Sequence, residues 1–150
     1  MSQSLVDVPL HFVFSTKDRI PFIKPEIEEE LHQYICGMSR KLGCPIIKIN
    51  SIEDHVHILL SYGKTITFSD LISKLKSSSS RWMKTKGNHY KDFSWQKGYG
   101  GFAVCNSSME SVIKYIASQK EHHKHKTFKE EYLEMLKRAK ISYDERYLWD

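Results

Sequence analysis

Hydrophobic residues recur with two different periods along this 150-residue chain. In four short segments β-branched and aromatic residues are frequent and side chains alternate between two faces, which is typical of strands. In four longer segments apolar residues recur every three or four positions, which predicts amphipathic helices. The predicted strands cover residues 10–15, 45–51, 55–60 and 102–105, and the predicted helices cover residues 25–42, 69–85, 108–122 and 127–140.

The first predicted helix has clear signals at both ends. Pro25 suits a first helical position, and Glu26 and Glu28 place negative charge in the first turn, where the helix dipole favours it. Gly43 is placed to end the helix, and Pro45 prevents its continuation. The next two strands are then separated by only a short turn, so we expect a hairpin.

The order of the elements is strand, helix, strand, strand, helix, strand, followed by two further helices. This order predicts an α+β, ferredoxin-like (βαββαβ) fold, in which helices cover one face of a four-stranded antiparallel sheet. The C-terminal helices are additions to that core. We expect one domain over residues 1–150, with the other face of the sheet open for a ligand.

Composition narrows the class of protein without naming a function. Hydrophobic residues make up 40% of the chain and charged residues 27%, as in a globular protein. The three cysteines have no paired spacing, which argues against a disulfide framework. The sequence has no signal peptide and no apolar run long enough to span a bilayer, so we expect a cytoplasmic protein without a membrane partner. The net charge of +5 favours an anionic partner.

Two histidines stand on one face of the third predicted strand. His55 and His57 point one way, while Val56 and Ile58 point the other way, toward a core. Residues two apart on a strand are roughly 6.5–7 Å apart at Cα, which lets two imidazoles converge on one divalent ion. The alternative is a pair of half-buried histidines that form local hydrogen bonds.

A tyrosine and a glutamine share a helical face further along the chain. Tyr115 and Gln119 are four residues apart, beside the apolar positions Ile116 and Ala117. A tyrosine hydroxyl becomes a useful nucleophile when a metal polarises the phosphate that it attacks. A glutamine carbonyl is a neutral oxygen ligand that can join two histidines. The alternative is an ordinary amphipathic helix.

Basic and aromatic residues alternate between Ile72 and Gly101. This stretch has seven basic residues and one acidic residue, a net charge of +6. Lysines that follow phosphates and rings that stack on bases suit single-stranded nucleic acid. The alternative is a solvated helix followed by a loop whose aromatics reach the core. The candidate DNA-binding residues are Lys74, Lys76, Arg81, Lys84, Trp95, Lys97 and Tyr99.

Two polar runs have no assigned role. The four serines from Ser77 to Ser80 suit close approach of another backbone, hydrogen bonds to phosphate, or a fraying helix end. The histidines His122, His123 and His125 alternate with lysines that would repel a cation. We therefore expect this second run to contact phosphate rather than a metal.

Taken together, these motifs resemble the HUH single-tyrosine transposases of small bacterial insertion sequences, including the relatives associated with repetitive extragenic palindromes. His55-Val56-His57 matches the His-hydrophobic-His motif, and Tyr115-Ile116-Ala117-Ser118-Gln119 is similar to the helix motif Tyr-Ile-x-x-Gln. The segment from Trp95 to Gly100 is similar to Trp-Gln-x-Gly-Tyr-Gly. The similarity extends in order over nearly the whole chain.

The resemblance implies an enzyme that cleaves and rejoins single-stranded DNA. Tyr115 would be the catalytic nucleophile and would form a 5′-phosphotyrosine link. His55, His57 and Gln119 would bind a divalent metal, Mg²⁺ or Mn²⁺. The partners implied are DNA hairpins and a second copy of the chain, as a homodimer.

Two other functions remain open at this stage. One is a non-catalytic module that binds single-stranded nucleic acid, which would need neither Tyr115 nor Gln119. The other is a domesticated relative that cuts host palindromes without mobilising its own gene. The sequence does not separate this second alternative from a mobile element.

Overall fold

The chain folds around a four-stranded antiparallel sheet, and the structure, a computed structural model, describes residues 2–150. The strands lie in the order β2-β3-β1-β4. They are β1 (Pro9–Ser15), β2 (Ile46–Ile52), β3 (His55–Ser61) and β4 (Gly100–Ala103). The α-helices are α1 (Pro25–Lys41), α2 (Phe68–Lys84), α3 (Met109–Ala117), α4 (Gln119–His122) and α5 (Phe128–Arg138), with short 3₁₀ turns at η1 (Lys17–Arg19), η2 (Asn88–Tyr90) and η3 (Asn106–Ser108). This order confirms the predicted ferredoxin-like, α+β fold.

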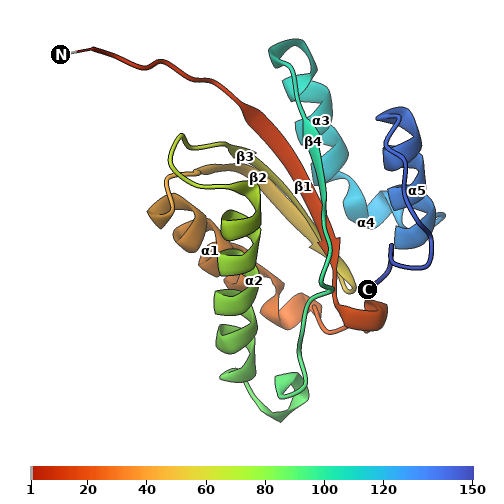
Figure 1. Cartoon of the computed structure of the whole chain (residues 1–150). Coiled ribbons are helices and arrows are strands. Elements are labelled where there is room, and N and C mark those ends of the chain that lie inside the picture. Colours follow the sequence, from red (N-terminus) through yellow and green to blue (C-terminus); the bar gives the residue numbers. More distant parts are fainter. Residues whose placement is uncertain (1) are drawn as a thin grey trace.

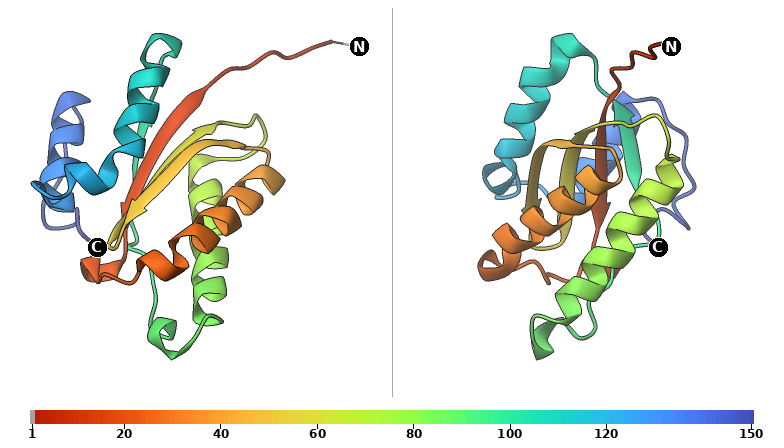
Figure 2. Two further views of the ribbon diagram at one scale, coloured as in Figure 1. Left: turned by 180° about the vertical axis from the view of Figure 1, so that it is seen from behind. Right: turned by 90° about the vertical axis from the view of Figure 1, so that its left-hand side faces the viewer.

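The helices form two layers, one on each side of the sheet. α1 and α2 cover one face, and α3, α4 and α5 lie over the other face (Figures 1 and 2). The face that the sequence left open for a ligand is therefore partly covered by the C-terminal helices. Among residues 2–150 no helix is both long and apolar enough to cross a membrane.

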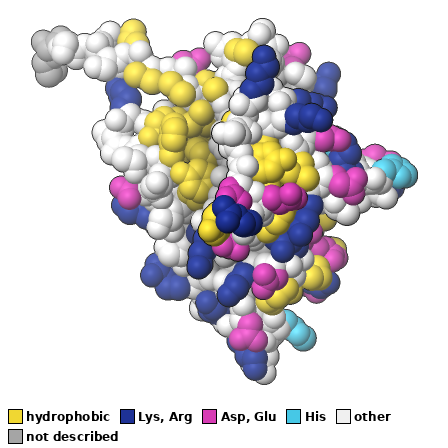
Figure 3. All heavy atoms as spheres, turned by 45° about the vertical axis from the view of Figure 1, so that its right-hand side comes forward, with side chains coloured by type: hydrophobic (Ala, Val, Ile, Leu, Met, Phe, Trp, Pro, Cys, Tyr) yellow, Lys and Arg dark blue, Asp and Glu magenta, His cyan; other side chains and the backbone are white. Residues whose placement is uncertain are grey.

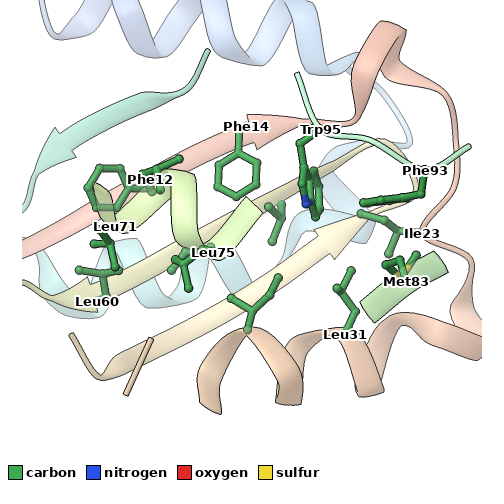
Figure 4. Close-up of a cluster of buried hydrophobic side chains, with 14 of the residues drawn as sticks. Phe12, Phe14, Ile23, Leu31, Leu60, Leu71, Leu75, Met83, Phe93 and Trp95 are labelled. Carbon is green, nitrogen blue, oxygen red and sulfur yellow. The ribbon is translucent and has the colours of Figure 1, made fainter. Parts of the chain in front are cut away.

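The main hydrophobic core lies between the sheet and the α1–α2 layer. Phe12 and Phe14 of β1 point into it beside Leu71 and Leu75 of α2 (Figure 4). Val56, Ile58 and Leu60 of β3 are fully buried in the same core, as the alternation of that strand predicted. Because side chains alternate along a strand, this orientation directs His55 and His57 toward the opposite layer.

The serine run lets a neighbouring loop pack closely on α2. The Ser79 hydroxyl accepts a hydrogen bond of 2.9 Å from the Trp95 indole N–H. The Ser80 hydroxyl donates to the Phe93 carbonyl at 3.2 Å. Ser78 and Ser79 are buried and donate to carbonyls one turn earlier in the helix. Of the three alternatives, close approach is the one that these buried serines adopt.

Most predicted boundaries differ from the structure by one or two residues, and two of the differences change the sheet edge and the third predicted helix. The last strand begins at Gly100 rather than at residue 102, because Gly100 and Gly101 pair with Val13 and Phe12 of β1. A Cβ on Gly101 would lie 2.9 Å from the Phe12 ring, so the glycine makes this pairing possible. The predicted helix 108–122 is interrupted at Ser118 (φ −95°, ψ 17°), which separates α3 from α4.

Two glycines predict opposite responses to the same substitution. A Cβ on Gly63 would lie 2.5 Å from the Gly43 carbonyl oxygen, which is backbone and cannot rotate away. We expect Gly63→Ala to lower the free energy of unfolding by about 1–3 kcal/mol. Gly37, inside α1, has no atom within 4 Å of the position that a Cβ would take. Because alanine favours a helix more than glycine does, Gly37→Ala is expected to raise the free energy of unfolding by about 0.5–1 kcal/mol. Urea unfolding of both variants checks the prediction, and equal shifts would contradict it.

Candidate active site

Two strand histidines form the base of the candidate site. His55 and His57 are fully buried on the face of β3 that points toward α3, α4 and α5. His57 Nδ1 lies 2.8 Å from Nε2 of His11, its neighbour on β1. His55 Nδ1 lies 2.7 Å from Asp54 Oδ1. Each strand histidine is therefore held through Nδ1, and its Nε2 is directed away from that partner.

A carboxylate from α5 lies over both histidines. Glu131 Oε1 is 3.0 Å from His57 Nε2 and 3.3 Å from His55 Nε2. His123, in the segment between α4 and α5, places its Nε2 3.0 Å from the same oxygen. A capping box between Thr127 and Glu130 fixes the start of α5 and so the position of Glu131 one residue later.

The candidate nucleophile is close to this cluster. The Tyr115 hydroxyl donates a hydrogen bond to Glu131 Oε2, the oxygen that does not face His57. The Tyr115 ring centroid is 5.8 Å from that of His57. Asn50 of β2 donates to the Ile116 carbonyl at 2.8 Å, which ties the end of α3 to the sheet. The tyrosine, the two strand histidines and the glutamate come from one chain, so one chain contains the whole arrangement.

Gln119 is fully buried at the start of α4. Its side-chain N–H donates to the Tyr115 carbonyl at 3.2 Å, as expected for residues four apart. The sequence placed Gln119 at the edge of the buried stripe and Ala117 within it, but Ala117 is exposed. The interruption at Ser118 accounts for Gln119 alone, because it redirects only the residues that follow it, whereas Ala117 is the last residue of α3.

Burial and neighbouring charge shift the pKa values of the cluster in different directions. Burial lowers the pKa of His57 to about 4 and that of His11 to about 3. Burial acts to lower the pKa of His55, but the Asp54 and Glu131 carboxylates outweigh it and leave the pKa raised. Burial acts to raise the pKa of Glu131, but the imidazoles of His123, His55 and His57 hold it far below its ordinary range. At neutral pH the cluster therefore contains an ionised carboxylate and a neutral His57.

The tyrosine environment has the opposite effect. Burial and the adjacent Glu131 carboxylate raise the pKa of Tyr115 above its ordinary value. Without a nearby cation the hydroxyl therefore stays protonated at neutral pH. A phosphate polarised by a cation is the kind of target that a neutral tyrosine needs.

The residues at the site fit a divalent metal. The side-chain N and O ligand atoms of His55, His57, His123 and Glu131 all lie within 4.8 Å of one another. Within residues 2–150, His55 Nε2 and Gln119 Oε1 are buried side-chain atoms without a hydrogen-bond partner. An unpaired buried polar atom is costly, and a cation bound at the histidines would satisfy His55 Nε2. Imidazole, carboxylate and amide oxygen are all common ligands of divalent ions in proteins.

A cavity of about 360 Å³ opens beside Tyr115, between α3 and α5. Tyr115, His11 and His122 line it, together with the basic side chains Lys126 and Arg138. Glu134 also lines the cavity and pairs with Lys126 at 2.7 Å, so Arg138 is the lining cation that stays available for a phosphate.

The predicted DNA-binding residues lie across the sheet from Tyr115. α2 carries Lys74, Arg81 and Lys84 with exposed side chains, and Lys97 is exposed in the following loop. Tyr99 is half-buried at the rim of a second cavity of about 450 Å³, between α2 and that loop. On the face toward α5, by contrast, Lys and Arg side chains are mixed with Asp and Glu side chains (Figure 3).

Two of the predicted DNA-binding residues have structural partners instead of a free surface. Trp95 is buried against the rings of Phe14 and Phe93, at centroid distances of 5.0 and 4.9 Å. This is the alternative in which loop aromatics reach the core. Lys76 donates to the carbonyls of Gln96, Lys97 and Gly98 at 2.8, 3.2 and 2.6 Å. Burial lowers its pKa to about 8.

The sequence prediction missed two members of the cluster. His123 was assigned to a run expected to avoid metal, but its side chain is only 6% exposed and faces Glu131. The lysines beside it point elsewhere, since Lys124 pairs with Glu121 and Lys126 with Glu134. Glu131 had one available signal, its position three residues after Phe128 on the apolar side of the last helix.

A His-hydrophobic-His strand on a ferredoxin-like sheet, with a helix tyrosine beside it, defines the HUH single-tyrosine transposases. The chain belongs to the IS200-like transposase family, whose model matches residues 4–119. It is therefore a DNA-processing enzyme of the transposase type.

Individual relatives agree with this assignment. The chain is 25% identical over 114 residues to the ISDra2 transposase TnpA of Deinococcus radiodurans, a match that covers 73% of this chain and 81% of the relative. A crystal structure of a transposase from Deinococcus radiodurans R1 superposes with a TM-score of 0.62 at 21% identity, covering 79% of this chain and 98% of the other. A REP-associated tyrosine transposase bound to a REP hairpin has a TM-score of 0.61 at 16% identity, covering 82% of this chain and 74% of the other. At these identities the two structures support the shared fold.

Proposed function

We propose that this transposase cleaves and rejoins single-stranded DNA through a covalent bond to Tyr115. The observation that carries the proposal is the position of the Tyr115 hydroxyl. The hydroxyl donates a hydrogen bond to Glu131 Oε2. The other carboxylate oxygen, Oε1, contacts both histidines of the His-x-His strand. A nucleophile and a metal-binding set within one buried cluster is what phosphoryl transfer needs and what a binding module does not need.

The reaction follows from the groups present. His55, His57 and Gln119 would hold the divalent ion, which would neutralise charge on the scissile phosphate. The Tyr115 oxygen attacks phosphorus, the bond from phosphorus to the 3′ oxygen breaks, and the tyrosine proton is lost to water. The leaving strand takes up a proton and ends in a 3′-hydroxyl, while the other strand stays linked as a 5′-phosphotyrosine. Attack by a 3′-hydroxyl on that link reverses the step and rejoins DNA.

We assign recognition of hairpin-bearing DNA to the α2 side of the sheet. The exposed basic residues Lys74, Arg81, Lys84 and Lys97 suit the phosphates of a hairpin stem. Tyr99 stands where the loop from α2 turns into β4, the edge strand beside β1. A hairpin on α2 whose single-stranded arm passes around the β4 edge would reach the Tyr115 cavity. The relative bound to a REP hairpin supports this kind of partner.

Homodimer formation, expected from the resemblance, is a separate part of the proposal. Tyr115, His55 and His57 lie together in one chain, so the proposed reaction is written with the tyrosine and the histidines of the same chain. Light scattering of the purified protein, with and without hairpin DNA, tests for the dimer. A mass of one chain under both conditions would contradict it.

A covalent-adduct assay tests the proposed reaction. The protein is mixed with labelled single-stranded oligonucleotides that tile the DNA around its gene, in the presence of Mn²⁺, and run on a denaturing gel. We expect a shifted protein–DNA band that is absent when EDTA is added. Metal-independent binding without an adduct would favour the binding module.

Hairpin-forming ends close to the gene would favour a mobile element over a domesticated relative.

The ligand set also predicts a metal preference. Imidazole nitrogens suit borderline ions better than Mg²⁺, whereas phosphate and amide oxygens accept Mg²⁺ or Mn²⁺. We therefore expect Mn²⁺ to support adduct formation at a concentration equal to or lower than that of Mg²⁺. Titration of both ions in the same assay measures the two half-maximal concentrations. If the half-maximal Mg²⁺ concentration were much lower than that of Mn²⁺, a site with two imidazole ligands would be contradicted.

A further inference from the structure

Glu131 and His123 lie outside the part of the chain that the family model describes. That match ends at residue 119, at Gln119 itself. The Glu131 side chain is nevertheless only 2% exposed and lies at the centre of the cluster, with His55, His57 and His123 around one of its oxygens. Neither residue has a role in the reaction as described so far.

Hydrogen bonds at Nδ1 orient the three histidine rings so that their Nε2 atoms face Glu131 Oε1. Nδ1 of His123 lies 2.6 Å from the Lys126 carbonyl, which can only accept, so Nδ1 carries a proton. Nδ1 of His55 faces the Asp54 carboxylate at 2.7 Å in the same manner. His57 Nδ1 is bonded to His11. The Nε2 atoms of His55 and His123 both face Glu131 Oε1, at 3.3 and 3.0 Å.

This arrangement is what surrounds a bound metal in proteins. Histidine ligands usually donate their second nitrogen to a carboxylate, a carbonyl or another polar group, which fixes the tautomer and the ring orientation. Here each of the three histidines has such a partner. Three imidazole nitrogens and a carboxylate oxygen that converge within 4.8 Å of one another are a donor set that divalent cations bind.

We propose that His123 and Glu131 are ligands of the same divalent ion that His55 and His57 bind. This inference rests on the proposed function, because it takes the His-x-His pair to be a metal site. With Gln119 the set contains three imidazoles, one carboxylate and one amide oxygen. An ion held by this set would supply positive charge to a phosphate oxygen that binds beside it. The second Glu131 oxygen, which accepts the Tyr115 hydrogen bond, places the nucleophile next to that position.

Metal binding without DNA tests the proposal independently of cleavage. Isothermal titration with Mn²⁺ is carried out on the wild type and on Glu131→Gln, Glu131→Asp and His123→Ala. We expect Mn²⁺ affinity to fall by about 10- to 100-fold or more in each, since loss of an outer partner alone costs that much. The matched controls are Glu134→Gln on the exposed side of α5 and His125→Ala, which is exposed in the same segment as His123. Both should bind Mn²⁺ like the wild type.

Co²⁺ provides a second readout that does not depend on affinity. Its visible absorption reports the number and type of ligands, so the spectrum of Glu131→Gln at saturating Co²⁺ should differ from that of the wild type. Thermal unfolding and circular dichroism identify any variant that fails to fold. If Glu131→Gln does not fold, Glu131→Asp, which keeps the negative charge, is used in its place.

The outcomes separate this inference from the proposed function. If His57→Ala loses Mn²⁺ binding while Glu131→Gln and His123→Ala keep wild-type affinity and spectrum, the two residues are not ligands. The His-x-His site would then stand without them. If His57→Ala also binds Mn²⁺ like the wild type, the proposed metal site itself is wrong. Tighter binding in Glu131→Gln would mean that the carboxylate competes with the ion, which also overturns the inference.

Discussion

Tyr115→Phe is expected to eliminate the covalent protein–DNA adduct. The substitution removes only the hydroxyl, which is the attacking group in the proposed reaction and the donor of the hydrogen bond to Glu131. When an enzyme loses a nucleophile that works together with other catalytic groups, its turnover falls by about 10⁴-fold or more. The ring stays in place beside His57 and His122, at centroid distances of 5.8 and 5.2 Å, so the fold should survive. The adduct gel measures the result.

The controls for this variant are tyrosines far from the cluster. Tyr143 and Tyr147 are 47% and 66% exposed near the end of the chain, and their phenylalanine variants should form the adduct at the wild-type rate. Tyr115→Phe should also bind Mn²⁺ and single-stranded DNA as well as the wild type does. A full adduct band from Tyr115→Phe would show that another side chain is the nucleophile.

His57→Ala is expected to abolish both metal binding and cleavage. His57 is fully buried and lies within hydrogen-bond distance of His11 on one side and Glu131 on the other. Removing it deletes a proposed metal ligand and leaves the Glu131 carboxylate with one partner fewer in a buried position. We expect Mn²⁺ affinity to fall by more than about 100-fold, because loss of an outer partner already costs 10- to 100-fold. His11 is such an outer partner, because its Nε2 lies 2.8 Å from His57 Nδ1, so we expect His11→Ala to lower Mn²⁺ affinity by only about 10- to 100-fold.

The measurements for His57→Ala are Mn²⁺ titration and the adduct assay at the Mn²⁺ concentration that saturates the wild type. His89 is exposed in η2, so His89→Ala is the control for a lost histidine. Circular dichroism confirms that the sheet is retained. An active His57→Ala enzyme would exclude His57 as a required ligand.

Local patterns predicted the elements that carry the chemistry. Alternation along residues 55–60 correctly placed the two histidines on the face opposite Val56 and Ile58. Helical spacing predicted the contact between Gln119 and Tyr115, although α3 ends between them. These predictions succeeded because they depend on the geometry of a single strand or a single helix turn, which sequence spacing determines.

Predictions that depended on what packs against a segment were less successful. The aromatic Trp95 suited a base-stacking surface, but the small side chain of Ser79 let it approach α2 and enter the core. The run around His123 suggested an exposed basic segment, yet α5 folds back and buries that one histidine. In both cases the residue type allows an exposed and a buried position, and the partner that decides between them is distant in sequence.

The sequence by itself determined the βαββαβ order, the common face of His55 and His57, and the family of transposases to which the chain belongs. These properties follow from short-range periodicity and from motifs in a fixed order. Only the tertiary structure brought Glu131 over the histidine pair and joined it to Tyr115, 16 residues earlier in the chain. The physical reason is that the position of α5 depends on the packing of Phe128, Tyr132 and Leu136 against the sheet, and periodicity within one helix does not specify that packing.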